Sequence, residues 1–116
     1  MDDLARVQVT LVDDCYVATI TGEIDMSNAE DLASVLEQQL VRDADRHIVD
    51  LTGTTYLDSA GVRMLFAIAE RLQTRGRELH VIVPEAAPIH RVLLIVDLAS
   101  RALVHPRLED AFDGDR

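Results

Sequence analysis

Hydrophobic and polar residues alternate near the start of the chain. Apolar side chains at every second position between residues 7 and 11 predict a half-buried strand, because successive side chains of a strand point to opposite faces. Asp13 and Asp14 interrupt the pattern as a polar turn, and residues 16–21 form a second predicted strand. The two strands are therefore expected to make a hairpin, after which residues 22–26 are expected to leave the sheet.

Two stretches carry apolar residues at spacings of three and four, the period of an amphipathic helix. The first opens with Ser27-Asn28-Ala29-Glu30, which fits a capping box in which the Ser27 hydroxyl and the Glu30 carboxylate bond each other's end N–H groups. Its apolar stripe consists of Ala29, Leu32, Ala33, Leu36 and Leu40. The second helix follows Ala60, and Gly76 is predicted to end it. Its apolar stripe consists of Val62, Leu65, Ile68, Ala69 and Leu72.

Shorter apolar runs separate and follow these helices. Residues 48–51 are rich in β-branched side chains and predict a buried strand, and residues 53–55 predict a polar turn. Residues 79–83 form another apolar run of strand length, closed by Pro84. Residues 101–104 are expected to form a short last strand.

The C-terminal part also predicts helices, and the order of elements indicates the fold class. Pro88 suits the first turn of a helix, and Pro106 is expected to open a final helical turn that reaches Phe112. The buried face of the first of these helices is expected to be Ile89, Val92, Leu93 and Val96. Strands alternating with helices after a hairpin predict an α/β fold, a mixed sheet of four to five strands with about four helices packed against it. We expect one domain over residues 1–116, with its core at about 7–112.

Composition and charge narrow the possible functions. A chain of 116 residues with 48% hydrophobic content fits one globular domain. The net charge of −10, without a block of basic residues, disfavours direct binding to nucleic acid. The chain opens with Met1-Asp2-Asp3 and has no apolar run of membrane-spanning length, so we expect a cytoplasmic protein with no membrane partner. The single cysteine, Cys15, is predicted to be a small buried hydrophobe.

Ser59 is the sharpest candidate for function. It follows Asp58 at the predicted start of the second helix, where backbone N–H groups lack partners and a phosphate would be tolerated. The simplest interpretation is that Ser59 or Asp58 merely caps the helix. A serine hydrolase is a second interpretation, but Leu57 stands where a nucleophile elbow needs glycine. The histidines that could act as a base are scattered through the sequence, so no catalytic residue and no enzyme activity are predicted.

Carboxylates near the same end of the predicted sheet are a weaker signal. Glu23, Asp25 and Asp58 match no compact metal-binding loop, and Glu23 is most simply a solvated side chain. Asp25 is expected to be either a turn residue or a partner contact. His47, His80, His90, His105 and Cys15 show no ligand spacing, so neither a metal nor another cofactor is predicted.

Two short segments of the chain resemble the signatures of a known family. Gly22-Glu23-Ile24-Asp25 before one helix and Leu57-Asp58-Ser59-Ala60-Gly61-Val62 at the start of the next are similar to those of STAS domains. Within that family, they most resemble the bacterial anti-sigma factor antagonists. The order of elements matches from about residue 7 to residue 112. Ala60 stands where some relatives carry a second serine or threonine.

The resemblance implies a regulatory function. In this family the serine at the position of Ser59 is phosphorylated by a partner that is both a serine kinase and an anti-sigma factor. The unphosphorylated antagonist binds that partner and frees the sigma factor, and the phosphorylated form is released until a phosphatase restores it. The partner would supply ATP and Mg²⁺. Asp25, Asp58, Ser59 and Gly61 are the expected partner-binding residues. The alternative is a STAS subunit that docks, without phosphorylation, in a lipid-transport or stress-signalling complex.

Overall fold

The computed structural model describes residues 5–40 and 42–113, with the side chains of Leu40 and Asp113 left aside. The predicted place of Leu40 in the apolar stripe therefore lies outside the described residues. The strands are β1 (Ala5–Val12), β2 (Cys15–Ile24), β3 (Arg46–Asp50), β4 (Thr54–Leu57), β5 (Leu79–Ile82) and β6 (Leu103–His105). The helices are α1 (Ala29–Leu40), α2 (Ser59–Gln73), α3 (His90–Ile95), the 3-10 turn η1 (Leu98–Ser100) and α4 (Leu108–Asp113).

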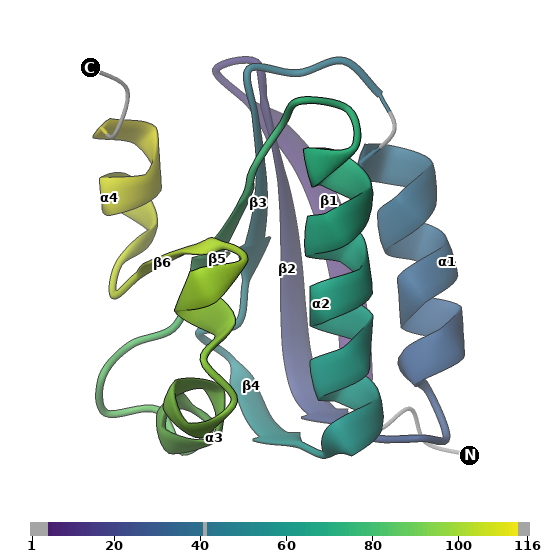
Figure 1. Ribbon diagram of the computed structural model, residues 1–116, viewed down its shortest axis with the longest axis vertical. Helices are drawn as coiled ribbons and strands as arrows, with labels where there is room; N and C mark the ends of the chain where they lie inside the picture. Colours follow the sequence, from purple (N-terminus) through teal and green to yellow (C-terminus); the bar gives the residue numbers. More distant parts are fainter. Residues whose placement is uncertain (1–4, 41, 114–116) are drawn as a thin grey trace.

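The described strands form one mixed sheet in the order β1-β2-β3-β5-β6 (Figure 1). The predicted hairpin is confirmed, because β1 and β2 pair antiparallel across a turn in which Asp13 and Asp14 both have positive φ. Strands β2, β3, β5 and β6 pair in parallel. The segments between them must therefore cross over the sheet, and the helices α1 and α2 make two of these crossovers.

The sheet has six strands in the described part of the chain, where four to five were predicted. The additional strand is β4, which pairs only with β2 and includes residues 54 and 55 of the predicted turn. The expectation that residues 22–26 leave the sheet is also wrong at its start. β2 continues to Ile24 through a register shift at Gly22, whose φ is 99°, and this extension is the part that pairs with β4.

Two hydrophobic cores lie on opposite faces of the sheet. Helices α1 and α2 lie side by side over one face, where Ile20, Val49 and Leu65 are fully buried (Figure 1). Helix α4 covers part of the other face with a smaller cluster built on Val17, Ile48, Ile82 and Ala111. Cys15 belongs to this second cluster with 4% of its surface exposed, as predicted, and burial raises the pKa of its thiol.

The ends of α2 are defined by local hydrogen bonds. At its C-terminal end, Arg77 N–H donates to Leu72 O at 2.8 Å and Gly76 N–H donates to Gln73 O at 2.9 Å. This is the Schellman pattern, and the φ of +73° at Gly76 explains why glycine ends the helix as predicted. The N-terminal end, capped by Asp58, carries the candidate site.

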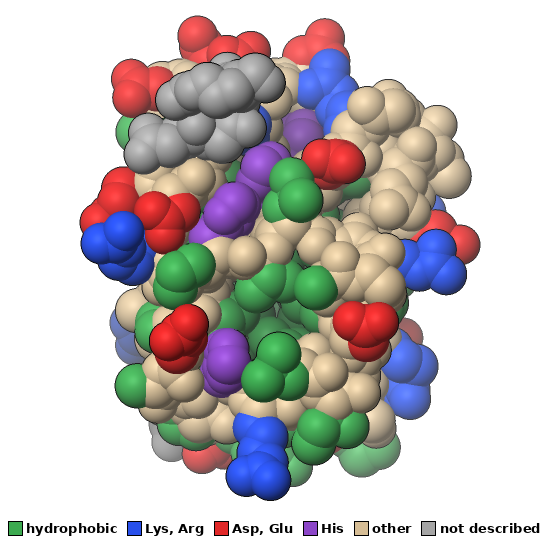
Figure 2. Space-filling model, turned by 60° about the vertical axis from the view of Figure 1, so that its left-hand side comes forward, with side chains coloured by type: hydrophobic (Ala, Val, Ile, Leu, Met, Phe, Trp, Pro, Cys, Tyr) green, Lys and Arg blue, Asp and Glu red, His purple; other side chains and the backbone are tan. Residues whose placement is uncertain are grey.

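The C-terminal elements agree in order with the predictions and are shorter. Of the predicted buried face, Leu93 of α3 and Ile89 just before it are buried, whereas Val92 and Val96 are only half-buried. Leu94 and Ile95 of α3 are 64% and 75% exposed. A small hollow of about 80 Å³ lies between α3 and β6, on a face where hydrophobic side chains gather (Figure 2). The last strand spans residues 103–105 and the last helix begins at Leu108.

Candidate functional site

Ser59 is the first residue of α2 and its side chain is exposed. The cap of the helix is Asp58, whose Oδ1 accepts hydrogen bonds from Ala60 N–H at 2.8 Å and Gly61 N–H at 3.2 Å. Within the described residues, the Ser59 hydroxyl has no hydrogen-bond partner. The capping role therefore belongs to Asp58, and the Ser59 hydroxyl remains open to another molecule.

The loop between β2 and α1 is folded around Asp25. Its Oδ1 accepts from the Ser27 hydroxyl at 2.5 Å and from Ser27 N–H at 2.9 Å. These two hydrogen bonds lower the pKa of the Asp25 carboxyl below its ordinary value, and the bond from the Ser27 hydroxyl has the larger effect. Asp25 N–H donates to Asn28 Oδ1 at 3.0 Å, and Asp25 O accepts from Ala29 N–H at 2.9 Å. Asp25 is thus a turn residue, which was one of its two predicted roles.

The predicted capping box is wrong. The Ser27 hydroxyl donates back to Asp25, and Glu30 is an exposed side chain in the first turn of α1. Asn28 precedes the helix and uses its side chain to fasten the loop, with Nδ2 donating to Glu23 O at 2.9 Å. The Asp25 carboxylate is a charged acceptor, so its hydrogen bond from the Ser27 hydroxyl is stronger than a bond between neutral groups.

The two segments singled out in the sequence meet at this end of the sheet. Met26 N–H donates to Asp58 Oδ2 at 3.2 Å, and Asp58 N–H donates to Ile24 O at 3.2 Å. One carboxylate therefore binds the first turn of α2 and the loop before α1 together. Glu23 is exposed, and its register partner across the β2–β4 pair is Tyr56.

Gly61 is buried and occupies a place that no larger residue fits. A Cβ at this position would lie 2.4 Å from Leu57 Cδ1 and 2.9 Å from Ile24 Cγ2. These side chains are themselves buried, so they have little room to move away. Gly61 lets α2 approach β2 and β4 closely. Because Gly61 is buried, it would influence partner binding by fixing where Ser59 lies and not by touching the partner.

Two large apolar side chains are exposed beside this site. Met26 is 81% exposed and Tyr56 is 50% exposed. The backbone N–H of Met26 donates a hydrogen bond to the Asp58 carboxylate, and Tyr56 precedes Asp58 by two residues. These residues come from the β2–α1 loop and from the junction of β4 and α2, and we call the group Asp25, Met26, Tyr56, Asp58 and Ser59 the Ser59 surface. Met26 and Tyr56 are of the residue types that are enriched at interfaces between proteins, which suits contact with another protein.

Two histidines that are far apart in the sequence, His80 and His105, meet where β5 and β6 pair. His80 Nδ1 and His105 Nε2 are 3.0 Å apart and the two rings stack, while His47 is buried on the neighbouring strand. Sequence reasoning missed this group, because only the register of the parallel strands brings His80 next to β6. Among the described residues, no hydrogen bond joins a histidine to Ser59.

The histidine group makes stability depend on pH. Burial, and then the neighbouring His105, lower the pKa of His80 to about 4 from its ordinary 6.5. The unfolded chain therefore takes up a proton on this side chain between about pH 6.5 and 4, while the folded protein does not. The free energy of unfolding should therefore decrease as the pH is lowered from about 6.5 to 4, and His80 should account for roughly 3 kcal/mol of that decrease. Urea unfolding of the protein at a series of pH values measures this loss.

A control variant is needed to separate the contribution of His80 to this pH dependence from that of the rest of the protein. His80→Gln should show a shallower fall of the free energy of unfolding between pH 7 and 4.5, whereas Ala67→Gln, at an exposed and non-titrating position of α2, should keep the original slope. If His80→Gln and the unchanged protein had equal slopes, the buried histidine would not be the cause.

Within residues 5–40 and 42–113, no helix has the length and apolar composition that crossing a membrane requires. In the same part of the chain, no group of three or more histidine, cysteine, aspartate or glutamate side chains is arranged to hold a metal ion.

Comparison with known proteins adds to the geometry. A family model described as the STAS domain matches residues 6–111. A protein of Bordetella bronchiseptica named BtrV, an anti-sigma factor antagonist by prediction, is 31% identical over 74 residues. That match covers 64% of this chain and 64% of the relative, so the chain spans just under two thirds of the relative's length.

Solved structures share the fold along nearly the whole chain. An anti-sigma factor antagonist from Mycobacterium paratuberculosis has a TM-score of 0.85 at 25% identity, covering 94% of this chain and 92% of its own. The anti-sigma factor antagonist SpoIIAA in its unphosphorylated form has a TM-score of 0.70 at 16% identity, covering 93% and 96%. At that identity the second likeness concerns the fold alone.

Proposed function

The chain belongs to the STAS domain family, and on this basis we propose that it is an anti-sigma factor antagonist controlled by phosphorylation of Ser59. The unphosphorylated protein binds an anti-sigma factor that is also a serine kinase, and so frees the sigma factor. Transfer of a phosphoryl group from ATP to Ser59 by that partner ends the binding. The likeness to proteins described as anti-sigma factor antagonists supports the class of function.

The observation that carries the proposal is the state of the Ser59 hydroxyl. It is exposed at the first position of a 15-residue helix, while Asp58 performs the capping that would otherwise occupy a serine there. A kinase needs an acceptor hydroxyl that its own base and bound nucleotide can reach. This chain therefore acts as substrate, and the partner supplies ATP, Mg²⁺ and the catalytic groups.

The helix end explains how the fold can accept the new charge. A phosphoserine carries about −1.5 to −2 charges near neutral pH, and the N-terminal end of a helix favours an anion. Asp58, already bonded to Ala60 and Gly61, would be the nearest repelling carboxylate in the sequence. We therefore expect phosphorylation to leave the fold intact and to act on the partner.

The Ser59 surface suggests how the partner reads the change. Met26 and Tyr56 offer apolar contact area, and the two hydrogen bonds from Ser27 lower the pKa of the Asp25 carboxyl. A partner with basic and apolar side chains around its active site would fit this surface. A phosphatase would return the phosphorylated form to the binding state. With these partners the protein would work in the cytoplasm, without a bound cofactor of its own.

Phosphate incorporation tests the proposed acceptor. Incubation with the cognate kinase and labelled ATP should place about one phosphate on each molecule of the unchanged protein, and peptide mass spectrometry should locate it on Ser59. Ser59→Ala should take up none, because Ala60 offers no second hydroxyl at this helix end. Ser100→Ala, at an exposed serine of the turn η1 outside the Ser59 surface, is the matched control and should keep incorporation. Label that remained on Ser59→Ala would place the acceptor elsewhere.

The identity of the captured partner separates this function from its main alternative. A STAS subunit of a lipid-transport or stress-signalling complex would use the same surface for docking without phosphorylation. Capture from lysate of the source organism should yield a nucleotide-binding kinase with anti-sigma activity. Recovery of a membrane transporter, together with unmodified Ser59, would favour the docking subunit.

A further inference from the structure

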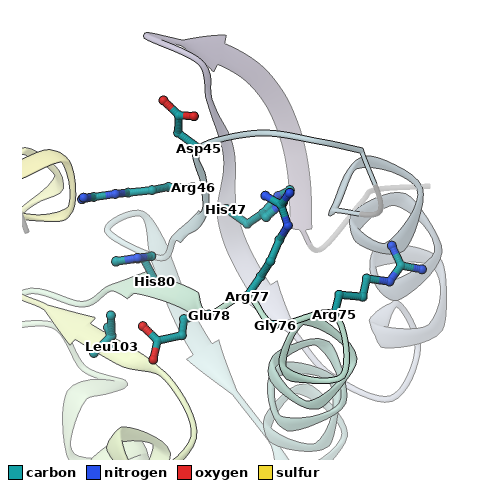
Figure 3. A pocket seen from close by; sticks show the side chains of 9 residues that line it. All are labelled: Asp45, Arg46, His47, Arg75, Gly76, Arg77, Glu78, His80 and Leu103. Atoms are coloured by element: carbon teal, nitrogen blue, oxygen red, sulfur yellow. The ribbon is translucent and has the colours of Figure 1, made fainter. Parts of the chain in front are cut away.

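Two hollows of the surface differ in what they could bind. One, of about 560 Å³, lies where the start of β3, the α2–β5 turn and β5 meet, and its three arginines point in different directions (Figure 3). These guanidinium groups therefore do not converge on one ligand. The other hollow, of about 430 Å³, lies between the start of β1 and the first half of α1. Four of the side chains that line it are apolar, namely Ala5, Val7, Leu32 and Val35.

β1, beside this second hollow, is an edge strand that lacks most of the usual protection against further pairing. Within residues 5–40 and 42–113 it pairs only with β2, so every second N–H and C=O of its backbone faces away from the sheet (Figure 1). Natural edge strands are commonly protected by shortness, bulges, prolines or charges. β6, at the opposite edge, has only three residues, whereas β1 has eight in a continuous register with β2, no proline and one charge, Arg6. The edge of β1 is therefore open to one more strand.

The side chains of β1 differ between the two faces of the sheet. On the face covered by α1, Ala5, Val7 and Val9 pack against the hydrophobic core and are half-buried. Leu11 lies on the same face by the alternation of the strand, and it is 58% exposed. The other face of β1 carries the exposed side chains Arg6, Gln8, Thr10 and Val12. An added strand with the same alternation would therefore continue the apolar face beside the hollow and the more polar face behind it.

A second copy of β1 has this alternation, and antiparallel pairing of the two copies keeps the faces matched. With Val9 of one copy opposite Val9 of the other, Val7 lies opposite Leu11 of the second copy. Leu11 of the second copy then lies beside the hollow that Val7 forms with Leu32 and Val35 of α1. The pairing therefore covers an apolar side chain that is exposed in the single chain.

The charges at the two ends of β1 also favour an antiparallel second copy. β1 contains one cation, Arg6, and no carboxylate, although the net charge of the chain is −10. The turn that follows β1 carries Asp13 and Asp14, which are both exposed. In the register centred on Val9, Arg6 lies opposite Val12 of the second copy and is diagonal to its Asp14, within reach of a long side chain. Two-fold symmetry makes this contact twice, whereas parallel pairing would place the two acidic turns side by side.

We propose that the free edge of β1 is a dimer interface, at which two copies of this chain pair through antiparallel β1 strands and join their sheets into one. The contact involves one strand of each copy and the hollow beside it, so the dimer is weak and dissociates on dilution. The dimer does not depend on the function proposed for Ser59, because no residue of the Ser59 surface takes part in the strand pairing.

Sedimentation equilibrium of the full chain over a series of concentrations measures this association. The unchanged protein should pass from monomer to dimer as its concentration rises, and Ser59→Ala should have the same dissociation constant. In the dimer, hydrogen exchange should slow at alternate backbone amides of β1 and stay unchanged at β6, the other edge. A monomer at every concentration up to about 1 mM would overturn the proposal.

Charge variants on the exposed face of β1 test the register. Gln8→Lys combined with Thr10→Lys puts like charges opposite each other across the two-fold axis and should weaken the dimer by about tenfold. Gln8→Glu combined with Thr10→Glu should weaken it similarly. An equimolar mixture of the two double variants should dimerise at least as tightly as the unchanged protein, because opposite charges then face each other.

The matched control adds the same two charges away from the β1 edge. Ala67→Lys combined with Thr74→Lys changes exposed positions on α2 and at its C-terminal cap, and the dissociation constant of the dimer should stay close to that of the unchanged protein. Circular dichroism of every variant should remain native. If both β1 double variants dimerised as the unchanged protein does, or if their mixture failed to recover the dimer, the edge of β1 would not be the interface.

Discussion

Gly61→Val is expected to lower the free energy of unfolding by roughly 3 kcal/mol, the upper part of the usual range for overpacking a core. The first added atom alone would lie 2.4 Å from Leu57 Cδ1 and 2.9 Å from Ile24 Cγ2. Both neighbours are buried at the junction of β2, β4 and α2, so α2 would have to move outward. Urea unfolding followed by circular dichroism measures the change.

Ala67→Val is the matched control for Gly61→Val. Ala67 is exposed on the same helix, so its replacement reports the helix propensity of valine without a clash, a cost of about 0.5 kcal/mol. Gly61→Ala adds one Cβ and should also destabilise the protein, although alanine is favoured over glycine in a helix by about 1 kcal/mol. If Gly61→Ala were as stable as the unchanged protein, Leu57 and Ile24 could rearrange easily.

Ser59→Asp is expected to weaken binding of the anti-sigma kinase by about tenfold and to leave the fold native. A single negative charge about 6 Å from one carboxylate of the partner is repelled by roughly 1 to 3 kcal/mol at a protein surface. At the first position of α2 the same charge should stabilise the isolated protein slightly, because the helix dipole favours it. Isothermal titration with the partner measures the first effect, and urea unfolding measures the second.

Ala67→Asp is the charge-matched control for Ser59→Asp. It adds the same charge to the exposed face of α2, eight residues or about 12 Å further along the helix. Its affinity for the partner should stay close to that of the unchanged protein. Equal losses from both variants would mean that the partner responds to net charge and not to the charge at the helix end.

Most of the fold could be predicted from the sequence because its main elements have regular hydrophobic periods. The hairpin and α2 follow directly from alternation and from a stripe with a glycine stop. Strand β4 was missed because it is short, Thr55 and Tyr56 on it are exposed, and its only partner is the extension of β2 beyond Gly22. Its existence depends on pairing between distant segments, and that leaves no local pattern.

The candidate site likewise has local features that the sequence predicts and contacts that only the fold creates. Ser59 and Asp58 could be predicted because a helix start is a local feature of the sequence. The bond between Met26 and Asp58, the close packing at Gly61 and the contact between His80 and His105 all require the tertiary structure. Ser27 was assigned to the wrong partner because the capping pattern ignores the Asp25 carboxylate two residues before it.

The proposed switch is tested most directly by the dissociation constant of the cognate anti-sigma kinase for one preparation of this protein before and after stoichiometric phosphorylation of Ser59. A phosphate with about two negative charges is repelled by roughly 1 to 5 kcal/mol by a single fixed carboxylate of the partner, and each 1.4 kcal/mol is about tenfold in affinity. We therefore predict that the phosphorylated protein binds at least about tenfold more weakly, with an unchanged circular dichroism spectrum. Equal dissociation constants for the two forms would contradict the account.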